Sequence, residues 1–231
     1  MRLSRVCSAL LALPVAFAGS GTNAADQPLA TTMIFDHKHL SNVDPGKEVA
    51  YKFHRTVSNP QVLGLPFSDD ITLKVVAAKP TGEKDVDLQI YTGERARDLQ
   101  KLPNLTINPV FLVYFNQAVN SFSMLAGGQR PYLTRLFSNG FKEKAKVEPV
   151  KVDYKGQKID AWRVSTVPYA GDPQEAKMEG WEGAEYVLVL SNQVPGEIVD
   201  LIAKYKNKYP GDLRLTERIT LDGVTGLEDV K

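Results

Sequence analysis

Alternation of apolar and polar residues predicts three β-strands in the first half of the chain. The alternating stretches are 48–56, 70–78 and 84–91. A period of two residues buries one face of a sheet and leaves the other in water. The connection 79–82 is short enough to make the second and third strands an antiparallel hairpin. The preceding residues, 25–47, are expected to form an extended lead-in with a turn near its end.

A helical period replaces this alternation after Asn108. Asn108 is a favourable N-cap, Pro109 suits the first helical position, and Gly127 supplies a C-terminal stop. One face of this predicted helix is apolar and carries Phe111, Phe115, Ala118, Phe122 and Leu125. A second helix with its own apolar stripe is expected to begin at Pro131 and to end before Glu148.

Strand patterns return after the second helix. They cover 150–154, 159–164, 185–191 and 213–221. The stretch 198–205 fits both a helix and a strand, and we favour a strand because a tight turn precedes it directly and no capping residue does. The order of three strands, two helices and about five strands predicts an α+β fold. We expect one domain over 25–231, in which a curved, half-barrel-like antiparallel sheet of about eight strands carries two central helices.

Residues 1–24 have the features of a secretory signal peptide. Arg2 and Arg5 precede an apolar stretch, and small residues suitable for cleavage follow it up to Ala24. The only cysteine, Cys7, lies inside this segment, so the mature protein is expected to contain neither a thiol nor a disulfide. These features predict a protein of the periplasm or a secreted protein.

The net charge of the mature chain argues against nucleic acid and anionic membranes as partners. Loss of the two leader arginines leaves 26 basic residues against 27 acidic ones, a net charge of −1. Such a chain has no long-range attraction for nucleic acid or for an anionic membrane. No later segment approaches the roughly 18 uninterrupted apolar residues that a transmembrane helix needs. The partners that we expect are therefore a lipid or an envelope protein.

Two resemblances to known proteins agree with a periplasmic or secreted location. The predicted layout, a curved sheet around an apolar helix, resembles the half-barrel of bacterial lipoprotein carriers and related periplasmic proteins. The stretches Asn108-Pro109, 169–173 and 191–196 resemble a family of secreted bacterial proteins that has no assigned activity. Together with the strand spacing, this second resemblance covers most of the mature chain. It implies an envelope location and brings no catalytic residues.

Two groups of residues are candidates for chemistry, and neither predicts a catalytic residue, a metal site or a cofactor. His37 and His39 could contribute two metal ligands, but a polar lead-in segment on the surface is the favoured interpretation. The acids Glu179, Glu182 and Glu185 flank Trp181, which could stack on a sugar ring. A secreted hydrolase of envelope carbohydrate is therefore the alternative function.

The aromatic face of the first helix carries the main functional hypothesis. Phe111, Phe115 and Phe122 would either belong to an ordinary core or line an apolar cavity beneath the curved sheet. The second possibility makes these three residues the candidate ligand-binding residues. The sequence then predicts a non-catalytic periplasmic envelope protein that binds a hydrophobic ligand (a lipid or an acyl chain) or a protein partner.

Overall fold

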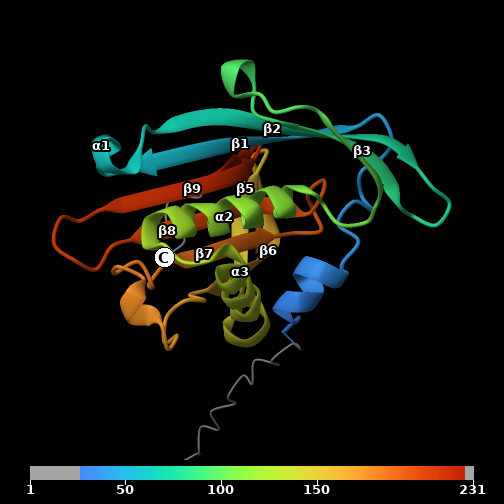
Figure 1. Cartoon of the computed structure of the whole chain (residues 1–231). Coiled ribbons are helices and arrows are strands. Elements are labelled where there is room, and N and C mark those ends of the chain that lie inside the picture. Colours follow the sequence, from blue (N-terminus) through green and yellow to red (C-terminus); the bar gives the residue numbers. More distant parts are fainter. Residues whose placement is uncertain (1–26, 227–231) are drawn as a thin grey trace, which may run out of the picture.

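The computed structural model describes residues 27–226, and the predicted signal peptide with Cys7 lies outside these residues. An antiparallel sheet of ten strands dominates the fold (Figure 1). The strands are β1 Glu48–Val57, β2 Phe67–Ala78, β3 Lys84–Ile90, β4 Gln100–Leu105, β5 Lys146–Tyr154, β6 Gln157–Thr166, β7 Glu185–Leu190, β8 Ile198–Lys206, β9 Arg214–Leu221 and β10 Val224–Thr225. Their order across the sheet is β10-β5-β6-β7-β8-β9-β1-β2-β3-β4. The sheet is open, and β10 and β4 are its edges.

Helices occupy the chain mainly between the fourth and fifth strands. The α-helices are α1 Pro60–Leu63, α2 Val110–Ala126 and α3 Arg130–Asn139. Short π-helical or 3₁₀ segments are η1 Thr32–Asp36, η2 Gly93–Arg95, η3 Gly140–Lys144 and η4 Glu175–Lys177. None of the helices within residues 27–226 is long and apolar enough to cross a membrane.

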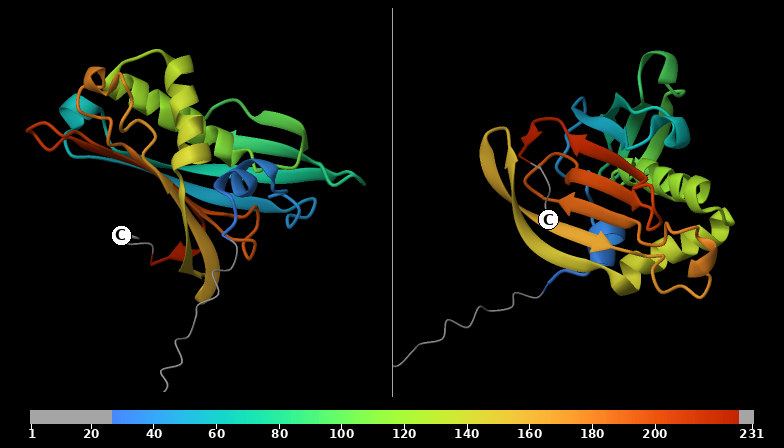
Figure 2. Two further views of the ribbon diagram at one scale, coloured as in Figure 1. Left: turned by 90° about the horizontal axis from the view of Figure 1, so that it is seen from below. Right: turned by 90° about the vertical axis from the view of Figure 1, so that its left-hand side faces the viewer.

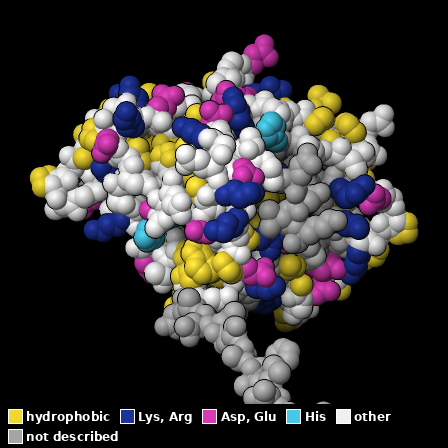
Figure 3. Space-filling model, turned by 180° about the vertical axis from the view of Figure 1, so that it is seen from behind, with side chains coloured by type: hydrophobic (Ala, Val, Ile, Leu, Met, Phe, Trp, Pro, Cys, Tyr) yellow, Lys and Arg dark blue, Asp and Glu magenta, His cyan; other side chains and the backbone are white. Residues whose placement is uncertain are grey.

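Helices α2 and α3 lie on one side of the twisted sheet, as Figure 2 shows. The opposite face, seen in Figure 3, carries interspersed charges of both signs. Ion pairs neutralise part of it. The Lys52 ammonium lies 2.6 Å from Asp70, and the Arg218 guanidinium lies 2.8 Å from Asp200. Strands such as β1 and β3 thus have one covered apolar face and one more polar face, as their alternation predicts, whereas β7 and β8 are buried on both faces.

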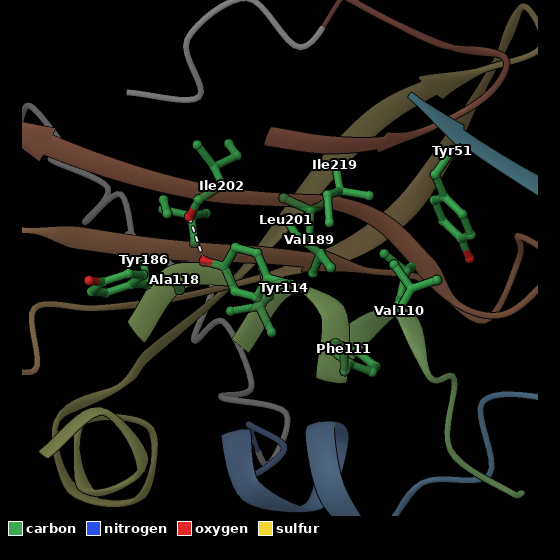
Figure 4. Close-up of a cluster of buried hydrophobic side chains, with 14 of the residues drawn as sticks. Tyr51, Val110, Phe111, Tyr114, Ala118, Tyr186, Val189, Leu201, Ile202 and Ile219 are labelled. Carbon is green, nitrogen blue, oxygen red and sulfur yellow. Dashed lines mark hydrogen bonds between the residues drawn. The ribbon is translucent and has the colours of Figure 1, made fainter. Parts of the chain in front are cut away.

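Two buried tyrosines join α2 to strand β8. The Tyr114 hydroxyl donates to the carbonyl of Ile202 at 2.6 Å, a bond drawn in Figure 4. The Tyr205 hydroxyl of β8 donates to the carbonyl of Ala118 at 3.0 Å. Burial raises the pKa of both phenols well above the usual value. Because each hydroxyl finds a carbonyl partner, α2 is anchored in orientation as well as by apolar packing.

Several predicted elements are confirmed. Helix α2 begins at Val110, one residue later than the predicted start at Pro109, and ends at Ala126, directly before the predicted stop at Gly127. The Asn108 side-chain oxygen accepts a bond from the Val110 amide at 3.0 Å. The ambiguous stretch 198–205 is a strand, β8, and it is buried on both faces. Burial on both faces explains its ambiguity, because its residues do not alternate between apolar and polar.

The strand count and the lead-in were predicted incorrectly. The sheet has ten strands instead of about eight, because β4 and the two-residue β10 were missed. Strand β4 is a largely exposed edge strand that contains Pro103, so it shows neither alternation nor a clean strand composition. The lead-in is not extended throughout. It contains the helical turn η1, whose Ile34 is fully buried.

Candidate functional site

A pocket of about 460 Å³ lies between the N-terminal segment and the β5–β8 part of the sheet. Apolar atoms make up most of the lining surface, and four stretches of the chain contribute to it. The lining residues are Pro28, Thr32, Met33, His37, His39, Pro149, Val150, Asp160, Ala161, Trp162, Leu190, Ser191, Asn192, Gln193 and Glu197. A concave, mostly apolar pocket of this size with a few polar groups is typical of a small-ligand site.

The turn between β7 and β8, residues 191–197, forms one wall of the pocket. Asn42 holds this turn through three bonds. It donates to the carbonyls of Val194 at 2.7 Å and Asn192 at 3.4 Å, and it accepts from the amide of Gly196 at 2.9 Å. Asn108 donates to the carbonyl of Gly196 at 2.9 Å and to the Tyr51 hydroxyl at 2.9 Å. The wall is therefore fixed by side chains from outside its own hairpin.

Gly196 must be a glycine for this arrangement. Its φ is +73°, and an added Cβ would lie 2.7 Å from the Asn108 side-chain nitrogen and 3.1 Å from the Tyr51 oxygen. The next residue, Glu197, also has a positive φ of 61°. Few residues other than glycine adopt this conformation, so the turn stores backbone strain directly beside the pocket.

Glu197 is the most buried acid of the pocket. It is 7% exposed, and one of its carboxylate oxygens lies 2.9 Å from Nε2 of His37. The side chain of His37 is itself 52% exposed. Burial raises the pKa of the Glu197 carboxyl above its usual value, although His37 acts in the opposite direction. Glu197 therefore carries a carboxylate whose burial is incompletely compensated by the protein.

His39 is buried on the same side of the pocket. Its Nε2 lies 2.7 Å from the carbonyl of Met33, so Nε2 carries the proton and Nδ1 is an acceptor. Nδ1 has no hydrogen-bond partner within the described residues. The ring packs on Phe111 with centroids 4.9 Å apart. Burial lowers the pKa of this imidazole, which favours its neutral form.

The predicted histidine pair is thus partly misplaced. His37 is exposed, as expected of a surface segment, but His39 is 1% exposed and belongs to the core. The ring centroids are 5.6 Å apart in an edge-on arrangement. Nε2 of His39 is already hydrogen-bonded to the carbonyl of Met33. In the part of the chain that the structure describes, no three His, Cys, Asp or Glu side chains come together as a metal site.

The three phenylalanines proposed as ligand-binding residues are packed among other rings. Phe111 and Phe115 lie 5.9 Å apart, and Phe115 also contacts Phe137 and three further rings, those of Phe35, Tyr114 and Phe141. Phe122 lies away from them and stacks on Tyr169 at 3.7 Å. None of the three lines the pocket of 460 Å³, which His39 separates from Phe111.

Two of the three acids around Trp181 are engaged in ion pairs. Glu182 contacts Lys208, and Glu185 contacts both Arg163 and Lys204. Trp181 itself is 5% exposed. A sugar ring cannot stack on a buried indole, so this group lacks the surface that the hydrolase hypothesis requires.

A second buried glutamate, Glu217 of β9, lies beneath α2 and is 2% exposed. One of its oxygens accepts bonds from the Arg55 guanidinium and, at 2.9 Å, from Gln117. The other oxygen accepts from the Ser121 hydroxyl at 2.7 Å. Both oxygens are thus satisfied by charged or polar donors, in contrast to those of Glu197.

The sequence alone did not predict the pocket, although it drew attention to two of the segments that hold the pocket wall in place. Asn108-Pro109 and the turn 191–196, which were noted for a family resemblance, meet in space through the bond from Asn108 to Gly196. The third such stretch lies elsewhere, where Asp172 accepts a bond from Tyr132. No known protein family, curated protein or solved structure matches this chain.

Proposed function

We propose that this protein is a non-catalytic binding protein of the cell envelope that holds a hydrophobic ligand, such as a lipid or an acyl chain, in the pocket beside η1. The observation that carries this proposal is the pocket of about 460 Å³, with Met33, Pro149, Trp162 and Leu190 in its lining. Burial of an alkyl chain against such a lining contributes about 0.8 kcal/mol per methylene group.

The architecture supports a binding role. Support comes from the open, twisted sheet with α2 across one face (Figure 2), a layout that we interpret as similar to the half-barrel of lipoprotein carriers. The leader-like residues 1–24 support an exported, periplasmic location, and so does the resemblance to a family of secreted bacterial proteins. A defined pocket favours a small hydrophobic ligand over a protein partner, which would need a large exposed surface.

Native mass spectrometry of the protein purified from its own envelope tests this proposal. The protein should carry an additional mass that organic solvent extracts. Thr32→Trp places a large side chain at an exposed position of the pocket lining and should abolish that mass. Lys38→Trp, an exposed neighbour outside the lining, is the matched control and should keep it.

Two results would contradict the proposal. One is a protein that carries no extractable ligand and binds no alkyl compound. The other is an identical bound mass in wild type and Thr32→Trp, since the ligand would then lie elsewhere. N-terminal sequencing of the same preparation tests the location, because an intact Met1 would rule out cleavage of the leader.

A further inference from the structure

The buried polar groups of the pocket are chiefly hydrogen-bond acceptors. Three polar lining residues are buried, namely His39, Ser191 and Glu197. Nδ1 of His39 is an acceptor without a partner in the described residues. The Ser191 hydroxyl donates its proton to the carbonyl of Asp160 at 2.6 Å. Glu197 contributes a carboxylate. A ligand that reaches these groups must therefore supply the donors.

The charge of the pocket lining also favours a ligand that supplies hydrogen-bond donors. Its lining, within residues 27–226, includes Glu197 and Asp160 but no lysine or arginine. Asp160 is neutralised at the surface by Lys151. The contact that the structure shows for Glu197 is His37, which is half-exposed and carries a full charge only when protonated. A positive group inside the pocket would relieve the cost of burying the Glu197 carboxylate.

Trp162 adds a third feature of the same kind. Trp162 belongs to the pocket lining and is half-buried. The face of an indole ring attracts cations, an effect of about 0.5–2 kcal/mol that grows as water is excluded. A carboxylate or phosphate head would instead be repelled by Glu197.

We propose that the head group of the ligand is a cationic hydrogen-bond donor, an amine attached to an alkyl or acyl chain, and that Glu197 binds it. This inference rests on the proposed function, because it assigns the polar end of the same pocket. The apolar lining holds the chain, and the Glu197 carboxylate receives the N–H groups of the amine.

Calorimetry with three ligands of equal chain length tests the head group. Decylamine, decanol and decanoate are titrated into the delipidated protein at neutral pH, below their aggregation concentrations. Decylamine should bind at least about tenfold more tightly than decanol, a difference of about 1.4 kcal/mol. Decanoate should bind most weakly. Equal or tighter binding of decanoate would overturn the assignment of the head group.

The outcomes separate the two proposals. If all three compounds bind with equal affinity, the pocket binds alkyl chains and the inference about the amine is wrong. If none of them binds, the proposed function fails and the inference fails with it. Thr32→Trp should weaken all three, because it obstructs the part of the pocket that they share.

A variant of Glu197 tests the residue itself. Glu197→Gln keeps the size of the side chain and removes its charge, so the preference for decylamine over decanol should fall by about tenfold, while decanol affinity stays unchanged. Unchanged decanol affinity also shows that the variant is folded. Glu83→Gln, at the exposed β2–β3 turn, is the control and should keep the preference. An undiminished preference in Glu197→Gln would overturn the role of Glu197.

Discussion

Two buried glutamates of this protein have nearly the same exposure and opposite surroundings. Glu217, beneath α2, is 2% exposed and receives donors on both oxygens, including the Arg55 guanidinium. Glu197, beside the pocket, is 7% exposed and contacts a half-exposed histidine. Burial alone therefore does not separate these two acids. They differ in the number of donors that the protein itself supplies to the carboxylate.

The largest expected effect is a difference in the free energy of unfolding between variants of these two acids. Glu217→Gln removes the charged partner of the partly buried Arg55 and should lower the free energy of unfolding by about 3–5 kcal/mol. Glu197→Gln should change it by less than about 1 kcal/mol, because the raised pKa of Glu197 shows that the folded protein does not favour its charge. Urea denaturation of both variants measures the difference. Equal losses would mean that the comparison is wrong.

An intermediate effect is expected at Asn108, which connects the start of α2 to the turn that carries Glu197. Asn108→Ala leaves the Tyr51 hydroxyl, the Gly196 carbonyl and the Val110 amide without their partner. We expect a loss of about 2–3 kcal/mol in the free energy of unfolding. Asn116→Ala, on the exposed face of α2, is the control and should be nearly neutral. A small loss at Asn108 would show that the turn is held mainly by Asn42.

The smallest expected effect is a change of the free energy of unfolding with pH, caused by His39 in the pocket lining. The pKa of His39 is lowered below 6.5, so the unfolded chain binds this proton more readily than the folded one. The contribution of His39 to stability is therefore complete above about pH 6.5 and is lost as the pH falls through the folded-state pKa. Its slope is at most about 1.4 kcal/mol per pH unit.

Denaturation of wild type and His39→Phe between pH 5 and 8 measures this slope. The variant should show a smaller loss of stability on acidification, whatever its stability at pH 8. His54→Gln, an exposed histidine on β1, should keep the wild-type slope. A His39→Phe slope equal to that of wild type would mean that this imidazole is not responsible for acid sensitivity.

Local signals in the sequence predicted much of the secondary structure, and distant contacts explain what they missed. The bounds of α2 follow from Asn108, Pro109 and Gly127, because caps and stops act within one turn. Strand β4 has no comparable signal, because an exposed edge strand needs no apolar face and tolerates Pro103. Its pairing with β3 is visible only in three dimensions.

The candidate site was less predictable than the fold. The phenylalanines of α2 were correctly placed on one face, but whether a helix face packs against rings or against a cavity depends on residues far along the chain. For Phe111 that residue is His39. Glu197 carried no signal of its own, since its burial depends on Asn42 and Asn108 fixing the turn before it. No spacing along the sequence encodes such a meeting.

The ladder between β1 and β9 has a consequence for how the chain acquires its structure. It pairs Tyr51 with Leu221, residues 170 positions apart (221 − 51), whereas β1–β4 and β5–β9 are each joined by pairings between consecutive strands. Closing so long a loop carries a larger entropy cost than forming a hairpin, and non-local pairing is slow. We therefore expect two locally assembling meanders whose union is the late kinetic step. In a chain that ends before β9, one edge of strand β1 would lack its hydrogen-bond partners.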